Sequence, residues 1–167
     1  SAEPGVLFWD TILKESVPDC YADLGYRTVS TNPCGEIPLC PYDSCRLLAI
    51  NLYSYVVNPF KPDAYFDFEL FQKHIALAQR IMDDIIDLEL EKIERIMEKI
   101  DADPESEDVK HTERILWDKI YKKSGQGRRT GVGITAEGDM LAAMGLHYGT
   151  EEATDFSEKV HKTIALE

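Results

Sequence analysis

Three residues with complementary chemistry occupy alternate positions of one proline-flanked segment: Asn32, Cys34 and Glu36. Pro33 and Pro38 each push the preceding residue toward extended backbone, and an extended chain places alternate side chains on one side at steps of about 7 Å. An amide can donate and accept hydrogen bonds, and a carboxylate can accept a proton. The spacing therefore predicts a catalytic trio on one face, and a purely structural Pro-rich loop is the alternative.

The four cysteines lack the spacing of a metal site. Thirteen, five and four residues separate them in turn, and the nearest histidine is His74. Zinc sites use pairs of ligands only a few residues apart, so we expect no metal here. Disulfides are also disfavoured in a cytosolic protein. We interpret Cys20 and Cys40 as ordinary core or loop thiols.

A glycine-rich segment, Gly131-Val-Gly133-Ile-Thr-Ala-Glu-Gly138-Asp139, matches neither nucleotide-binding motif. A phosphate-binding loop needs Lys and then Ser or Thr after its last glycine, and the dinucleotide motif needs glycine where residue 136 is alanine. We interpret the segment as a tight turn that leads into a helix starting at residue 135. Arg128 and Arg129, just before it, are expected to hold nearby carboxylates or helix C-termini.

The composition is that of one ordinary soluble domain: 167 residues, 44% hydrophobic and 29% charged. The formal charge of −13 opposes sequence-independent binding to nucleic acid or to an anionic membrane. Residues 83–108 contain twelve acidic and three basic side chains, so they supply −9 of this charge. We interpret this run as the solvated outer face of a helix.

No stretch approaches the roughly 20 apolar residues of a membrane span, and the N-terminus does not have the pattern of a secretory signal. We therefore expect a cytoplasmic protein. The sequence begins at Ser1 and stops inside a helical pattern, which suggests a piece of a longer polypeptide, here called the parent.

The elements that must position the candidate residues fall into three segments of one domain, 1–64, 65–124 and 125–167. The first contains seven of the eight prolines and all four cysteines, which favours turns and extended chain. Within it we expect a short helix over residues 6–13 and one or two short buried strands over 46–52 and 53–57.

From Asp67 onward, apolar residues recur at steps of three and four, which predicts one or two long amphipathic helices. Asp103 and Pro104 resemble a helix start, so a further helix is expected to run to about Tyr121. Its expected apolar face consists of Val109, Ile115, Leu116 and Ile120.

The third segment is expected to begin as a connector and to end in two helices. Residues 122–133 are basic and glycine-rich, which is typical of a linking segment. One helix is predicted from Thr135 to about Leu146. Another is predicted after a cap at Thr150, because two acidic residues follow that cap directly and favour the helix dipole.

The run Asn32-Pro-Cys-Gly-Glu36 resembles the active-site finger loop of ribonucleotide reductases, above all the adenosylcobalamin-dependent enzymes. Two further segments resemble that family in the same order: Cys45-Arg-Leu-Leu-Ala-Ile-Asn51-Leu52, around a reductant cysteine, and residues 127–139. The matches together cover most of the chain.

The resemblance implies reduction of ribonucleotides, here ribonucleoside diphosphates, to 2′-deoxyribonucleotides for DNA synthesis. Cys34 would become a thiyl radical that takes the 3′ hydrogen of the ribose, and Glu36 would act as base on the 3′ hydroxyl. Asn32 would orient the sugar hydroxyls. Cys45 would be one of two thiols that supply electrons. A cofactor must generate the radical, because ordinary side chains do not do so unaided.

The resemblance also implies that the chain is a fragment of a ten-stranded α/β barrel, mostly helical in itself with a few short strands. The parent would use adenosylcobalamin, nucleotide effectors and a thioredoxin-type or dithiol reductant, and it could form a homo-oligomer. No cofactor is expected in the fragment, which should be inactive alone. The second reductant cysteine would lie upstream, and residues 89–124 would form a surface helical insertion.

Two alternatives follow from the same residues. The diiron-dependent reductases share the Asn, Cys and Glu pattern, so the cobalamin class is a finer inference than the family. A protein of another class, a helical interaction or regulatory module, would contain the Cys34 segment as a buried structural loop. Nucleotide binding by the parent, with and without Cys34, separates this module from an enzyme.

Overall fold

A computed structural model describes residues 5–167, which divide into two compact units. The hairpin unit consists of the chain up to Cys45 together with Leu88–Arg129, and the sheet unit consists of Arg46–Asp87 and Thr130–Glu167. Helix α2 (Phe68–Ala102) contributes its first part to the sheet unit and its last part to the hairpin unit. No helix within residues 5–167 has the length and apolar character needed to cross a membrane.

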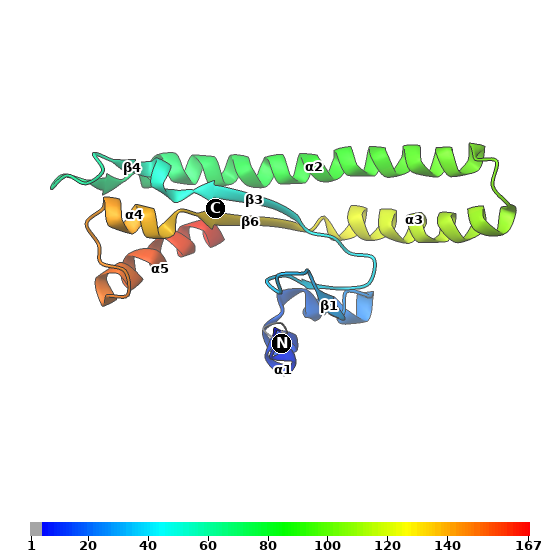
Figure 1. Ribbon diagram of the computed structural model, residues 1–167, viewed down its shortest axis with the longest axis horizontal. Helices are drawn as coiled ribbons and strands as arrows, with labels where there is room; N and C mark the ends of the chain where they lie inside the picture. The colour runs from blue at the N-terminus through cyan, green and yellow to red at the C-terminus, as the bar shows by residue number, and fades with distance from the viewer. Residues whose placement is uncertain (1–4) are drawn as a thin grey trace. The chain divides into compact units, whose positions relative to one another are not determined.

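The sheet unit is organised around two parallel strands, β3 (Arg46–Asn51) and β6 (Thr130–Thr135), which Figure 1 shows side by side. Their register places Arg46 opposite Thr130. The strand expected after Cys45 is therefore confirmed, although only Ile50 is buried and the other residues alternate between half-buried and exposed.

The second expected strand, over residues 53–57, is mostly not a strand. Leu52–Tyr55 forms a 3₁₀ helix, and only β4 (Val56–Val57) is extended, paired antiparallel with β5 (Tyr65–Phe66). The turn buries Leu52 and Tyr55 together in the core, which an alternating strand would separate onto opposite faces.

The glycine-rich segment is strand β6, so its interpretation as a tight turn is wrong. The two glycines alternate with Val132 and Ile134, which pack against the hydrophobic core of the unit. β-branched residues at every second position favour a strand with one buried face. The sharp change of direction comes later, at Ala136, whose φ of 60° lies in the left-handed region.

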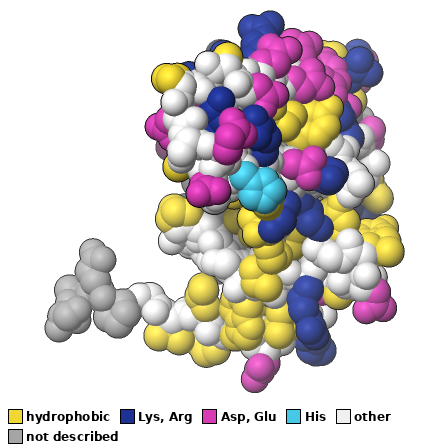
Figure 2. All heavy atoms as spheres, turned by 90° about the vertical axis from the view of Figure 1, so that its right-hand side faces the viewer, with side chains coloured by type: hydrophobic (Ala, Val, Ile, Leu, Met, Phe, Trp, Pro, Cys, Tyr) yellow, Lys and Arg dark blue, Asp and Glu magenta, His cyan; other side chains and the backbone are white. Residues whose placement is uncertain are grey.

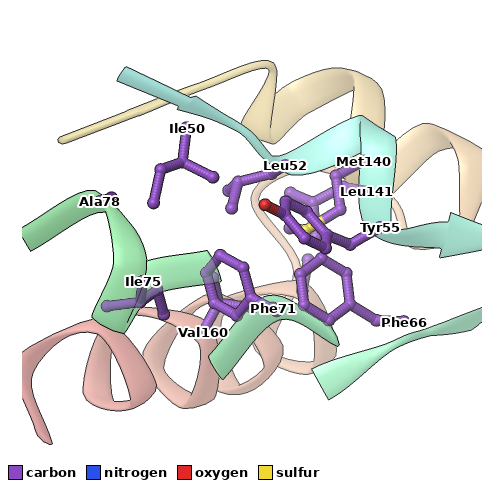
Figure 3. Close-up of a cluster of buried hydrophobic side chains, with 11 residues drawn as sticks. Ile50, Leu52, Tyr55, Phe66, Phe71, Ile75, Ala78, Met140, Leu141 and Val160 are labelled. Carbon is purple, nitrogen blue, oxygen red and sulfur yellow. The ribbon is translucent and has the colours of Figure 1, made fainter. Parts of the chain in front are cut away.

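Three helices cover the sheet unit: the first part of α2, α4 (Glu137–Ala143) and α5 (Glu151–Leu166). The predicted cap of α5 is confirmed, because the Thr150 hydroxyl accepts a hydrogen bond from the backbone N–H of Ala153 at 3.3 Å. Helix α4 is shorter at both ends than expected. Figure 3 shows the core that these elements bury: Ile50, Leu52, Tyr55, Phe66, Phe71, Ile75, Ala78, Met140, Leu141, Ala153 and Val160.

The hairpin unit begins with α1 (Trp9–Glu15), near the expected short helix, and a 3₁₀ helix (Val17–Leu24). Two short antiparallel strands follow, β1 (Ser30–Thr31) and β2 (Pro38–Leu39). The space-filling view in Figure 2 shows hydrophobic side chains gathered on the surface. The most exposed apolar residues of the N-terminal part are Val6, Phe8, Val17 and Leu24.

The last part of α2 and helix α3 (Glu107–Gly127) form an antiparallel pair within the hairpin unit (Figure 1). The Tyr121 hydroxyl donates to Glu94 at 2.8 Å, and Arg114 forms an ion pair with Asp101 at 2.5 Å. The expected helix start at Pro104 is wrong by three residues, since Ser106 is the N-terminal boundary residue. The helix also continues six residues beyond Tyr121, through much of the expected connector.

The expected apolar face of α3 is not its buried face. Val109, Ile115 and Leu116 are each more than 40% exposed, whereas Lys110 and Ser124 are buried. The aliphatic stem of a lysine can pack while its amine finds polar partners. Here the Lys110 amine donates to the backbone carbonyl of Asp101 at 3.2 Å, so a charged residue lies on the contact side of the helix.

We expect Phe71→Ala to lower the free energy of unfolding by about 3–5 kcal/mol, because it leaves a cavity in a filled core. Phe71 is fully buried, with its ring 4.9 Å from Tyr55 and 5.1 Å from Phe66 between centroids. The control is Leu77→Ala on the same helix, which is 57% exposed and should cost less than about 1 kcal/mol. Urea unfolding measures both, and equal losses would contradict this core.

Candidate active site

Asn32, Cys34 and Glu36 lie in the loop that joins β1 to β2. The backbone of Asn32 donates to the carbonyl of Ile37 at 3.2 Å, and the side-chain oxygen of Asn32 accepts from the Ile37 N–H at 2.9 Å. These two hydrogen bonds close the loop at its base. The structure therefore places the three predicted residues in one hairpin loop, with Asn32 at its base.

The loop is a turn, so the expectation of an extended backbone over this segment is wrong. The Gly35 N–H donates to the Asn32 carbonyl at 3.0 Å, and Gly35 has a φ of 84°. A side chain at Gly35 would be strained by this conformation and would meet Leu7 at 3.2 Å. Pro33 fits this turn because proline is favoured at its second position.

The turn leaves the chemistry-bearing side chains accessible. Cys34 and Glu36 are exposed, whereas Asn32 is half-buried at the base of the loop. Cys34 and Glu36 are two positions apart on this loop, and both are open to a ligand that docks on it. The arrangement suits hydrogen transfer at the thiol and proton transfer at the carboxylate.

Cys45, the fourth predicted residue, lies in the hairpin unit but outside the β1–β2 hairpin. It is half-buried and directly precedes β3. Two residues before it, Asp43 is fixed by its own turn, because its backbone N–H donates to the Cys40 carbonyl at 3.3 Å. The Asp43 carboxylate also accepts from the Ser44 N–H at 2.9 Å.

A buried ion pair joins this segment to the hairpin. The Nε of Arg129 lies 2.7 Å from Oδ2 of Asp43, whose side chain is only 3% exposed. The Nη1 of Arg129 donates to the backbone carbonyl of Pro38, in β2, at 3.1 Å. The expectation that Arg129 would hold a carboxylate is confirmed. Asp43 was missed, although its position two residues before Cys45 was a signal available in the sequence.

The two remaining cysteines lie in different environments. Cys20 is exposed, and Cys40 is buried with its thiol 3.5 Å from the Asp43 carboxylate, to which it donates. Burial raises the pKa of the Cys40 thiol, and the Asp43 charge raises the pKa further. All four cysteines are free, and within residues 5–167 no group of three His, Cys, Asp or Glu side chains is placed to hold a metal ion.

Comparison with known proteins decides the family. A family model described as ribonucleotide reductase, barrel domain, matches residues 1–167. The chain belongs to the ribonucleotide reductase family. The resemblance seen in the Asn32–Glu36 motif is therefore confirmed at the level of the family, over the whole chain. No solved structure matches it.

Curated relatives of this ribonucleotide reductase chain are named vitamin B12-dependent ribonucleoside-diphosphate reductases. The protein from Thermoplasma acidophilum is 32% identical over 164 residues, which are 98% of this chain and 17% of that protein. The protein from Mycobacterium tuberculosis strain CDC 1551 is 29% identical over 163 residues, 97% of this chain and 19% of that protein. The chain spans less than a fifth of the length of these relatives.

We expect Cys40 of this reductase chain to react with iodoacetamide at least about tenfold more slowly than Cys34 at pH 8. The thiolate is the reactive form, and Cys40 is both shielded and shifted toward the neutral thiol by its raised pKa. Peptide mass spectrometry over time measures the two rates, with exposed Cys20 as a second reference. In urea the rates should converge, and native rates that are already equal would show that Cys40 is accessible.

Proposed function

We propose that this chain is the portion of a vitamin B12-dependent ribonucleoside-diphosphate reductase that presents the hydrogen-abstracting thiol. The observation that supports this most is the position of Cys34, exposed at a glycine-dependent turn in a chain of the ribonucleotide reductase family. The names of the relatives from Thermoplasma and Mycobacterium favour the B12-dependent class and diphosphate substrates.

The reaction begins and ends at Cys34. Its thiyl radical takes the hydrogen atom from C3′ of the ribose, while Glu36 accepts the proton of the 3′ hydroxyl. The 2′ hydroxyl then leaves as water. Cys45 and a second thiol from the parent supply two electrons and two protons and become a disulfide, and Cys34 returns its hydrogen to C3′. In sum, a ribonucleotide and two thiols yield a deoxyribonucleotide, water and a disulfide.

Asn32 has a divided role in this scheme. Its side-chain oxygen accepts the hydrogen bond from Ile37 that closes the loop. Its amide NH2 group is therefore the part that can donate to a sugar hydroxyl. Because one side chain both closes the hairpin and contacts the sugar, the substrate is oriented relative to Cys34 by the fold of the loop itself.

Adenosylcobalamin would supply the radical chemistry, and Cys34 would give up its thiol hydrogen atom to become the thiyl radical. The exposed Cys34 sulfur would be open to a radical that the cofactor supplies. The chain spans less than a fifth of its curated relatives, and we assign the binding of the cofactor to the rest of the parent.

The parallel β3–β6 pair would be two strands of the ten-stranded α/β barrel of the parent. Each strand has one neighbour among residues 5–167, so its outer edge is available for pairing with further strands. The exposed apolar residues of the N-terminal part would be covered by the same barrel. We propose that the parent also binds nucleotide effectors and a thioredoxin-type or dithiol reductant, lies in the cytoplasm and self-associates. The division of this chain into segments 1–64, 65–124 and 125–167 stays a prediction.

We expect the purified 167-residue chain to form no deoxynucleotide from a ribonucleoside diphosphate with adenosylcobalamin and a dithiol. The reaction needs a second thiol and the cofactor and effector contacts of the parent. Chromatographic assay of the nucleotide products measures this. Catalytic deoxynucleotide formation by the chain alone would show that the site is complete within it.

We expect Cys34→Ser in the full-length parent to abolish cleavage of the 3′ C–H bond, because an O–H bond is too strong for the hydrogen shuttle. Cys45→Ser should retain that cleavage but release a damaged nucleotide, since Cys45 acts only afterwards. Substrate labelled with an isotope at C3′ measures the first step, and product analysis measures the second.

Each of these substitutions should cost no more than about 1 kcal/mol of folding free energy, which thermal unfolding checks. Cys20→Ser is the matched control, because Cys20 is exposed and has no role in the scheme. Loss of 3′ cleavage in Cys45→Ser, with retention in Cys34→Ser, would reverse the two assignments.

A further inference from the structure

The charged pair formed by Asp43 and Arg129 is largely enclosed by the protein. The two side chains are 3% and 16% exposed, whereas both side chains are more than 60% exposed in the surface pair of Lys73 and Glu69. The free energy needed to remove two charges from water offsets much of the attraction between them, so such a pair adds little net stability. Its hydrogen bonds are directional, which makes it suited to fixing geometry.

The pair links the two segments that carry the reactive cysteines. Through its Nη1, Arg129 holds the Pro38 carbonyl at the start of β2, the strand that leaves the Cys34 loop. Through its Nε, the same guanidinium holds Asp43, two residues before Cys45. One planar group thus contacts both segments.

Backbone hydrogen bonds hold the main chain at or beside both residues of the pair, Asp43 and Arg129. Asp43 is held by the turn to Cys40 and by the hydrogen bond that its carboxylate accepts from the Ser44 N–H. Arg129 follows the end of α3, where Arg128 takes a left-handed conformation and its N–H donates to the Ser124 carbonyl at 3.0 Å. A shift at either end would therefore move a cysteine-bearing segment as a whole.

We propose that the Asp43–Arg129 pair is a positioning element that sets the place of the Cys45 thiol relative to the Cys34 hairpin. This inference rests on the proposed function, in which Cys34 acts at C3′ and Cys45 delivers electrons as the neighbouring 2′ hydroxyl leaves. Two thiols that act on adjacent carbons need a defined separation, and a misplacement of about 1 Å can cost on the order of 100-fold in rate.

The two steps should depend on the pair to different degrees. The Cys34 loop is closed by its own hydrogen bonds between Asn32 and Ile37, which do not involve Arg129. The segment that leads to Cys45 contacts the guanidinium directly through Asp43. Loss of the charge on Asp43 should therefore leave 3′ C–H cleavage by Cys34 unchanged and lower the yield of the later reduction by Cys45.

The test uses the full-length parent with adenosylcobalamin, effector and substrate labelled at C3′, in a single turnover without external reductant. In Asp43→Asn we expect 3′ C–H cleavage within about threefold of the wild type. The yield of deoxynucleotide should fall on the order of 10- to 100-fold, with release of free base in its place. The matched control is Asp101→Asn, which removes the same charge from the exposed pair with Arg114 and should change neither readout.

Arg129 provides a second, independent variant pair if Asp43→Asn folds poorly. Arg129→Lys keeps the charge but cannot bond Asp43 and Pro38 with one planar fork, whereas Arg129→Met removes the charge. We expect the ratio of deoxynucleotide to released base to fall in the order wild type, Lys, Met. Equal ratios for Lys and Met would overturn a role for the charge in positioning.

The outcomes separate this inference from the proposed function. A wild-type parent that neither cleaves the 3′ C–H bond nor forms deoxynucleotide would overturn the proposed function itself. An active wild type with an unchanged product ratio in Asp43→Asn and Arg129→Met would overturn only the positioning role. A parallel loss of both steps in these variants, at the same protein concentration and thermal midpoint, would also overturn it.

Discussion

The parallel pairing of β3 with β6 is the constraint on which the other elements depend. Parallel neighbours cannot be joined by a tight turn, so the chain between Asn51 and Thr130 has to return to the end where β3 began. Helices α2 and α3 form most of that return path, and the first part of α2 supplies Phe71 and Ile75 to the core beside the sheet. The strand order thus requires a crossover connection, and the first part of α2 packs against the core as it runs back.

Two residues of the candidate site and its supporting ion pair lie where the chain enters these two strands. Cys45 directly precedes β3, and Arg129 directly precedes β6. The hairpin that bears Cys34 is short, with strands of two residues each, and short isolated hairpins have little stability of their own. Its closure by Asn32 and its anchoring through the Pro38 carbonyl compensate for that weakness, because both hydrogen bonds act on the backbone.

Local sequence was most informative where a structure depends on interactions between residues close together in the chain. The α2 helix follows from its three- and four-residue periodicity, and the α5 start follows from Thr150, since capping involves only neighbouring residues. The same local reading misjudged β6, because Gly131 and Gly133 outweighed the β-branched residues between them. It also misjudged the contact face of α3, where Lys110 is buried by partners on another helix.

By itself, the sequence determined the family and the identity of the candidate residues Asn32, Cys34 and Glu36, because a motif is a property of contiguous residues. The turn itself follows from local residues, because Pro33 and Gly35 both favour it and the Gly35 N–H bonds to the Asn32 carbonyl. Tertiary structure alone decided that Asp43 meets a guanidinium 86 positions away in the chain. That partnership depends on where α3 ends and where β6 begins. Those positions are set by packing and strand register, which no local pattern encodes.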